Sequence, residues 1–169
     1  YSVAILLAEI LGDRLDQREL RVFASDIDQD ALEFARAGVY ATADLAGLDP
    51  ERRKRWFRPD GGGWRVVKGL RELCVFSAHD LTGHPPFIRM DLVSCRNVLI
   101  YFQNPLQERV LGTFHYALAP AGLMFLGKSE SVFQHEDLFD TVNRDAKIFR
   151  RSGVAARAPL GPMRQPLRS

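Results

Sequence analysis

The sequence is poor in cysteine. Cys74 and Cys95 are its two cysteines, and they form neither a Cys-x-x-Cys pair nor a Cys/His cluster. This spacing argues against a disulfide scaffold and against a structural zinc site. We therefore predict no metal site, and we expect both thiols to be small buried hydrophobic side chains in a reducing compartment.

Long apolar runs and a large excess of one charge are also lacking. No stretch could span a bilayer, and residues 1–11 have neither a basic leading region nor a cleavage site, so we expect a cytoplasmic protein. The formal net charge of +2 gives no indication of nucleic acid or a membrane surface as a partner. At 169 residues, with 46% hydrophobic side chains, the chain fits one globular domain with a real core.

Short apolar runs alternate with helical segments, which is typical of a doubly wound α/β sheet. The helix over 29–37 has Asp28 as its predicted N-cap and Gly38 as its stop. A longer helix is predicted to start with Asn104 as its cap and Pro105 in its first turn, and to bury one face through Leu118. The buried strands are predicted at residues 21–25, 73–77, 91–95 and 123–127.

Residues 56–70 interrupt this alternation with a Gly-rich turn and a half-exposed strand. We interpret them as a small antiparallel β-subdomain, and the glycines as a hairpin tip, because no Gly-Lys-Ser/Thr follows them. A strongly basic helix face, residues 52–55, precedes the insertion. It is either a solvated surface or a docking surface for an acidic protein.

The last ordered part is predicted to be a hairpin formed by residues 138–142 and 146–150. A closing antiparallel strand favours the S-adenosylmethionine methyltransferase sheet over the dinucleotide-binding sheet, whose last strand is parallel. The predicted catalytic domain thus covers residues 1–150. Residues 151–169, rich in Pro, Gly, Ala and Arg, are predicted to be a disordered tail or linker.

Polar side chains stand where the predicted strands end. Asp26 closes the first strand, and Arg96 and Asn97 follow the strand at 91–95, with Tyr101 shortly after. Ligands bind at the carboxyl ends of strands in open α/β sheets, and an acid at such an end accepts hydrogen bonds from ribose hydroxyls. These residues are therefore predicted to face a nucleotide-like ligand.

Four strings carry a resemblance to a known family. The sequence resembles the CheR-type chemotaxis receptor methyltransferases over about residues 1–150. The most specific string is Cys-Arg-Asn-Val-Leu-Ile-Tyr-Phe. The strings lie, in order, at residues 23–28, 35–40, 95–102 and 127–130.

The resemblance implies S-adenosyl-L-methionine as cofactor and chemoreceptor glutamates as methyl acceptors in the receptor's cytoplasmic domain. Tyr101 is implied to lie near the transferring methyl group, as the catalytic residue. The implied cofactor contacts are Asp26 at the ribose, Asp80 and Leu81 at the adenine, and Arg96 and Asn97 along the cofactor.

Each assignment has a structural alternative. Asp26 could be a helix cap, and Asp80 a turn former. Arg96 and Asn97 could form a strand-end salt bridge and cap, and Tyr101 could be a buried core tyrosine. For the chain as a whole, the alternatives are a non-catalytic methyltransferase-like signalling module and a dinucleotide oxidoreductase.

Two departures from the family modify these expectations. The resemblance implies a Gly-rich loop and an N-terminal helical domain before Tyr1, and neither is in this sequence. We therefore expect residues 1–169 alone to bind S-adenosylmethionine weakly or not at all and to be inactive, as a segment of a hybrid signalling protein. The hairpin tip is about four residues shorter than in members that hold a receptor peptide, which argues against such tethering.

Overall fold

The computed structural model describes residues 1–17, 19–132 and 135–155, so most of the predicted tail, residues 156–169, lies outside the described residues. The chain forms two compact units, one over Tyr1–His79 and one from Asp80 onward. Each unit has its own buried apolar cluster and is described by itself.

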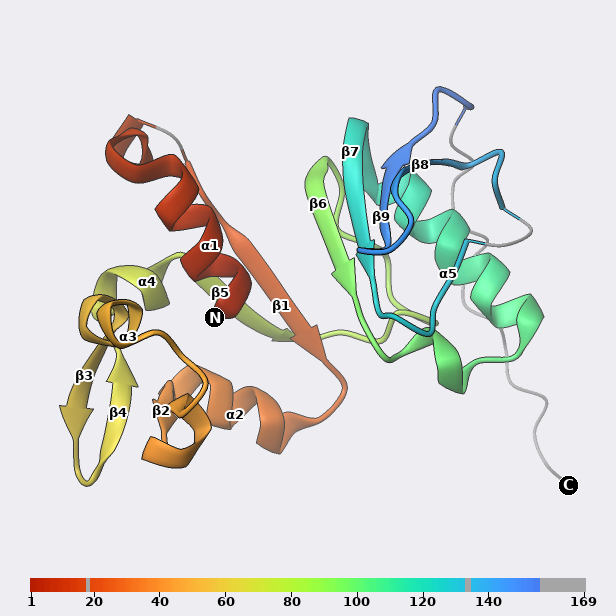
Figure 1. The fold of residues 1–169 in the computed structure, drawn as a ribbon. Coiled ribbons are helices and arrows are strands. Elements are labelled where there is room, and N and C mark those ends of the chain that lie inside the picture. Colours follow the sequence, from red (N-terminus) through yellow and green to blue (C-terminus); the bar gives the residue numbers. More distant parts are fainter. Residues whose placement is uncertain (18, 133–134, 156–169) are drawn as a thin grey trace, which may run out of the picture. The chain divides into compact units, whose positions relative to one another are not determined.

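The first unit contains a parallel strand pair and a small antiparallel sheet (Figure 1). Strand β1 pairs in parallel with β5, and β4 lies between β2 and β3, antiparallel to both. In chain order the elements are α1 (Ser2–Leu11), β1 (Val22–Asp26), α2 (Gln29–Ala37), β2 (Val39–Tyr40), α3 (Pro50–Trp56), β3 (Phe57–Asp60), β4 (Gly63–Val66), α4 (Lys68–Glu72) and β5 (Cys74–Ala78).

Helix α2 begins and ends where the sequence predicts. The Asp28 carboxylate accepts hydrogen bonds from the backbone N–H groups of Asp30 and Ala31, which satisfies two donors of the first turn. Gly38 ends the helix in the left-handed conformation, with φ of 63°. The local signals therefore suffice to set this helix.

The predicted hairpin in the insertion is also confirmed, since β3 and β4 are joined by a tight turn at Gly61 and Gly62. Both glycines have positive φ, 54° and 87°, as a two-residue hairpin turn requires. Two further elements had no sequence signal that we recognised. They are the two-residue strand β2, which pairs with β4, and the short helix α4.

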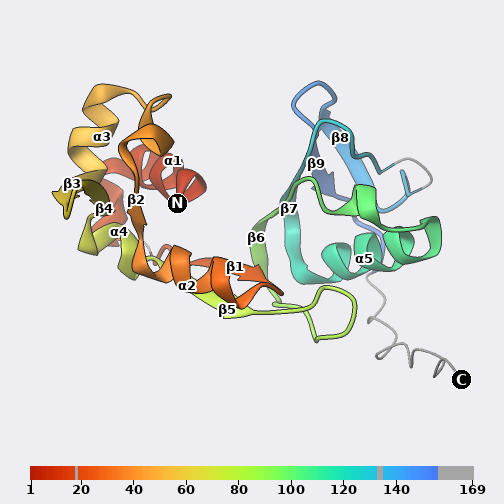
Figure 2. The same cartoon turned by 90° about the horizontal axis from the view of Figure 1, so that it is seen from below.

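The second unit is one four-stranded sheet with a helix along one face (Figure 2). Its strand order is β6-β7-β9-β8, in which β6 and β7 are parallel and β9 is antiparallel to both neighbours. The inserted antiparallel strand confirms the methyltransferase type of sheet and argues against the dinucleotide-binding sheet. The elements are β6 (Met90–Cys95), α5 (Asn104–Ala117), β7 (Leu118–Leu126), β8 (Phe139–Asn143) and β9 (Ile148–Arg151), so Arg151 belongs to a strand rather than to the tail.

The start and end of helix α5 differ from the prediction. Gln103, not Asn104, occupies the N-cap position, and it makes no side-chain cap hydrogen bond. The Gln107 side chain is drawn to the preceding turn, where its Nε2 donates to the carbonyls of Leu99 and Phe102. Leu118 begins β7 instead of ending the helix, because the backbone is already extended there.

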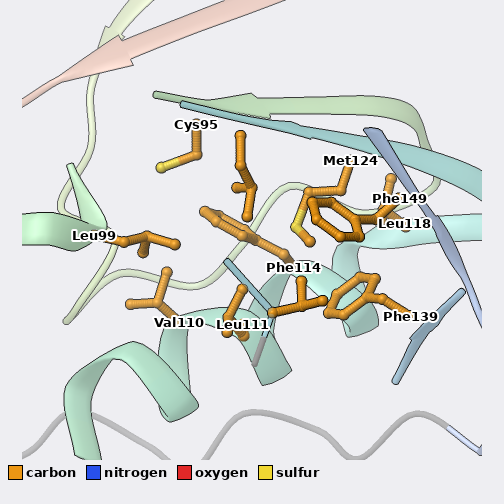
Figure 3. Close-up of a cluster of buried hydrophobic side chains, with 11 residues drawn as sticks. Cys95, Leu99, Val110, Leu111, Phe114, Leu118, Met124, Phe139 and Phe149 are labelled. Carbon is orange, nitrogen blue, oxygen red and sulfur yellow. The ribbon is translucent and has the colours of Figure 1, made fainter. Parts of the chain in front are cut away.

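The core of the second unit lies between α5 and the sheet (Figure 3). Val110, Phe114 and Met124 are almost fully buried, and the buried thiol of Cys95 lies among them, as predicted for a small hydrophobic side chain. The same prediction for Cys74, in the first unit, holds only in part, because this residue is partly exposed. In Figure 3, Leu99 lies at one end of the cluster and Phe139 near the other. Leu99, which lies in the loop of residues 96–101 after β6, is therefore part of the core itself.

His115 is buried on the core side of α5, 1% exposed, with its ring edge-on to Phe139. Burial, and then the positive charge of Arg151, lower the pKa of His115, although the backbone of Ser152 and the carboxylate of Asp137 act in the opposite direction. His115 is therefore neutral in the folded protein at pH values where an unfolded histidine, with a pKa of about 6.5, takes up a proton.

We expect the stability of the protein to fall as the pH drops below about 6.5, because the unfolded state then binds a proton that folded His115 does not. Replacing His115 with glutamine should flatten this part of the stability curve. The measurement is urea denaturation at several pH values between 5 and 7.5. A matched control is His135→Gln, at a histidine that is only partly buried, and equal pH slopes for all three proteins would contradict this role of His115.

Candidate functional site

The 96–101 loop follows strand β6 and carries three of the predicted site residues. Asn97 adopts the left-handed conformation, with φ of 59°, which asparagine tolerates better than most residues. A single 3-10 turn, Leu99–Tyr101, then leads toward helix α5. Leu99 is 2% exposed and packs in the core, so this side chain holds the loop against the core. The polar residues Arg96, Asn97 and Tyr101 are exposed.

Tyr101 is 80% exposed, which rules out the alternative that it is a buried core tyrosine. Its backbone N–H donates to the carbonyl of Val98, 3.1 Å away, so the turn fixes its Cα while the ring lies on the surface. An exposed phenol on a fixed backbone suits contact with a ligand.

Arg96 is exposed, and its guanidinium lies over the ring of Phe125, 4.8 Å from the ring centroid. Within the described part of the chain, it stacks on this ring instead of forming the predicted alternative, a strand-end salt bridge. A stacked guanidinium is held in one orientation and keeps its N–H donors at its edge. The contact of Arg96 with the cofactor stays a prediction.

Asp80 and Leu81 open the second unit. The Asp80 Oδ1 atom accepts hydrogen bonds from the backbone N–H and the hydroxyl of Thr82, both at 2.7 Å, and the Asp80 carbonyl accepts from the N–H groups of Gly83 and His84. Asp80 is thus a turn former, as the structural alternative held. Leu81 packs against the core of the unit. Their contact with adenine stays a prediction.

Asp26 is the last residue of β1, in the first unit. Its Oδ1 atom accepts from the backbone N–H of Asp28, 3.0 Å away, and Asp28 in turn caps helix α2. Asp26 itself is therefore not the helix cap. Its contact with a ribose stays a prediction, as does its placement beside the five candidate residues that lie in the second unit.

Glu130 is a buried acid to which the sequence-based interpretation gave no role of its own. The residue is 3% exposed, and its carboxylate accepts four backbone hydrogen bonds. Three donors belong to the 96–101 loop and one to the end of β7. They are the N–H groups of Asn97 at 3.0 Å, Val98 at 2.8 Å, Leu99 at 2.8 Å and Gly127 at 2.6 Å.

These hydrogen bonds decide the ionisation of Glu130. Burial by itself raises the pKa of the carboxyl group, but the N–H groups of Gly127, Val98, Leu99 and Asn97 together outweigh burial, so the pKa lies below its ordinary value. Glu130 is thus a carboxylate at neutral pH. Its contribution to stability is present above the ordinary glutamate pKa and is lost as the pH falls through the lowered one.

The basic face of α3 is partly neutralised and partly ordered by aromatic rings. Arg52 forms an ion pair with Glu9 at 2.8 Å, while the guanidinium groups of Arg53 and Arg55 lie over the rings of Trp64 and Trp56. These arginines are therefore not simply solvated, because Arg52 is paired with an acid and Arg53 and Arg55 lie on aromatic rings. A docking role for this face stays a prediction.

In residues 1–17, 19–132 and 135–155, no group of three or more His, Cys, Asp or Glu side chains could hold a metal ion. Within the same ranges, no helix is both long and apolar enough to cross a membrane.

The chain is similar to several known proteins. It is 41% identical over 143 residues to the chemotaxis protein methyltransferase of Klebsiella aerogenes, covering 79% of this chain and 48% of that protein. It is 37% identical over 157 residues to an uncharacterized 104.1 kDa protein of Rhodobacter capsulatus, covering 92% of this chain and 16% of that one. The chain thus spans less than two thirds of the length of these relatives.

Among solved structures, the chain is similar to the N-methyltransferase NodS from Bradyrhizobium japonicum in complex with S-adenosyl-L-homocysteine. The TM-score is 0.46 and the identity 16%, over 88% of this chain and 73% of that one. The family model described as "CheR methyltransferase, SAM binding domain" matches residues 1–148. This match covers nearly the whole described chain, and the protein therefore belongs to the CheR methyltransferase family, through its S-adenosylmethionine-binding domain.

Proposed function

We propose that the protein transfers a methyl group from S-adenosyl-L-methionine to glutamate side chains of chemoreceptor cytoplasmic domains. The observation that carries this proposal is the 96–101 loop of a CheR-family chain, which presents a stacked Arg96 and an exposed Tyr101 on a backbone fixed by Glu130. Relatives that share this segment are named chemotaxis protein methyltransferases.

The proposed reaction requires few protein groups. A glutamate carboxylate is already ionised at neutral pH, so one of its oxygens can attack the methyl carbon directly. The new C–O bond forms as the C–S bond breaks, and the electron pair stays on sulfur to give S-adenosyl-L-homocysteine. No proton moves, so the catalytic task is to align the two reactants. Arg96 and Tyr101 are suited to orient carboxylates by hydrogen bonding.

The proposal is tested with the full-length protein, methyl-labelled S-adenosylmethionine and a receptor cytoplasmic fragment. We expect the fragment to gain label that alkali releases as methanol, since methyl esters are base-labile. A receptor fragment with its acceptor glutamates replaced by alanine is the control and should gain none. Cofactor binding without transfer to any receptor fragment would favour the non-catalytic signalling module instead.

A further inference from the structure

We propose that Glu130 is a positioning residue for methyl transfer, whose buried carboxylate sets the backbone of the loop that carries Arg96, Asn97 and Tyr101. The inference rests on the proposed function, because it assigns a role within the same site. It concerns a residue whose carboxylate accepts its hydrogen bonds from backbone N–H groups of the site.

The hydrogen bonds of Glu130 join two strand ends. Oε1 accepts from Val98 and Leu99, while Oε2 accepts from Asn97 and Gly127, so each carboxylate oxygen has two donors. An ionised carboxylate has about four acceptor positions, and backbone N–H groups occupy all of them here. Glu130 therefore has no lone pair left to serve as a base, and its role is to hold the ends of β6 and β7 together.

The conformation of the loop explains why an anion is needed there. Asn97 is left-handed and Val98 is right-handed, with φ of −118° and ψ of −47°, so successive N–H groups point to one side. Such a concave arrangement of N–H groups binds anions. In this chain the anion is the side chain of Glu130, which compensates the strained conformation of Asn97.

The opposite end of the loop has further anchors besides Glu130. Leu99 packs in the core, and the Gln107 amide donates to the carbonyls of Leu99 and Phe102 at 3.0 and 2.8 Å. Loss of the Glu130 charge is therefore expected to loosen the stretch from Asn97 to Leu99 while the turn remains attached to α5. The side chains that move are the neighbouring Arg96 and Asn97, and then Tyr101.

The test uses Glu130→Gln in the full-length protein. Glutamine has nearly the same shape, but its amide NH2 group faces backbone donors and cannot accept from them. At a temperature where circular dichroism shows the variant to be folded, we expect kcat to fall at least tenfold and the Kd for S-adenosyl-L-homocysteine to rise severalfold. Amide resonances of Asn97, Val98 and Leu99 should shift or broaden. Glu108→Gln, on the exposed face of α5, is the matched control and should leave all three readouts unchanged.

A folded Glu130→Gln variant with kcat and Kd within twofold of the unmutated protein would overturn the inference and leave a purely structural role. If this variant does not fold, Glu130→Asp keeps the charge on a shorter side chain. Positioning then predicts a reduced kcat at an unchanged KM for the receptor, and an unchanged kcat would refute it. Absence of transfer by the unmutated protein in the same assay identifies a failure of the proposed function instead.

Discussion

Replacing Gly127 with alanine is expected to destabilise the protein by about 3 kcal/mol, because the added methyl group has no space. A Cβ atom at this position would lie 2.6 Å from Oε2 of Glu130, 2.8 Å from Oδ1 of Asn97 and 3.0 Å from the Asn97 nitrogen. The Glu130 carboxylate cannot move aside without lengthening its hydrogen bonds to four backbone N–H groups. The measurement is the free energy of unfolding in urea.

Gly112→Ala is the matched control for this substitution. Gly112 lies inside helix α5, and a Cβ atom there would meet nothing within 4 Å. Alanine should therefore stabilise the protein by about 0.5–1 kcal/mol, since it is the better helix former. If the two variants were equally stable, the close approach of Gly127 to Glu130 would have no energetic importance.

The contrast between helix α2 and Glu130 shows what the sequence could predict. The start of α2 depends on Asp28 and the N–H groups two and three residues later, so neighbouring residues contain the whole signal. Glu130 contacts residues about 32 positions earlier in the chain. No periodic pattern in the sequence points to a partner so far away. The sequence around Glu130 shows only an acidic residue shortly after an apolar strand.

The same distinction explains the errors at helix α5 and in the first unit. Asn104 and Gln107 form a plausible capping pattern, but Gln107 instead bonds the carbonyls of the preceding turn. Strand β2 has two residues and exists because β4 lies beside it. The parallel pairs and the closing antiparallel strand were predictable, because buried strands and a hairpin leave a pattern in the sequence.

The sequence predicted which residues form the loop of the candidate site better than it predicted how their side chains are held. The position of Arg96, Asn97 and Tyr101 just after a buried strand indicated a ligand-facing loop, and the structure brings these three together on one loop. The stacking of Arg96 on Phe125 could not be predicted, since it depends on the register between β6 and β7. The turn-forming role of Asp80 was one of two alternatives that the sequence left open.

Tyr101→Phe in the full-length protein is expected to lower kcat for receptor methylation by at least tenfold, with the Kd for S-adenosyl-L-homocysteine nearly unchanged. The substitution removes one hydroxyl from a side chain that is 80% exposed, so it leaves the fold intact and adds no cavity. A hydrogen bond to a charged acceptor contributes about 1.5–3 kcal/mol, and 1.4 kcal/mol corresponds to a tenfold change in rate. The measurements are steady-state transfer of labelled methyl groups and calorimetry.

Tyr116→Phe is the matched control, since this tyrosine on helix α5 is also solvent-accessible, 36% exposed, and lies outside the 96–101 loop. It should leave both kcat and Kd unchanged. Equal turnover in the Tyr101→Phe and unmutated proteins would remove Tyr101 from the mechanism and leave Arg96 as the residue of the loop that orients the acceptor. A raised Kd with an unchanged kcat would instead place the hydroxyl on the cofactor, because the lost interaction would then be made equally in the bound state and in the transition state.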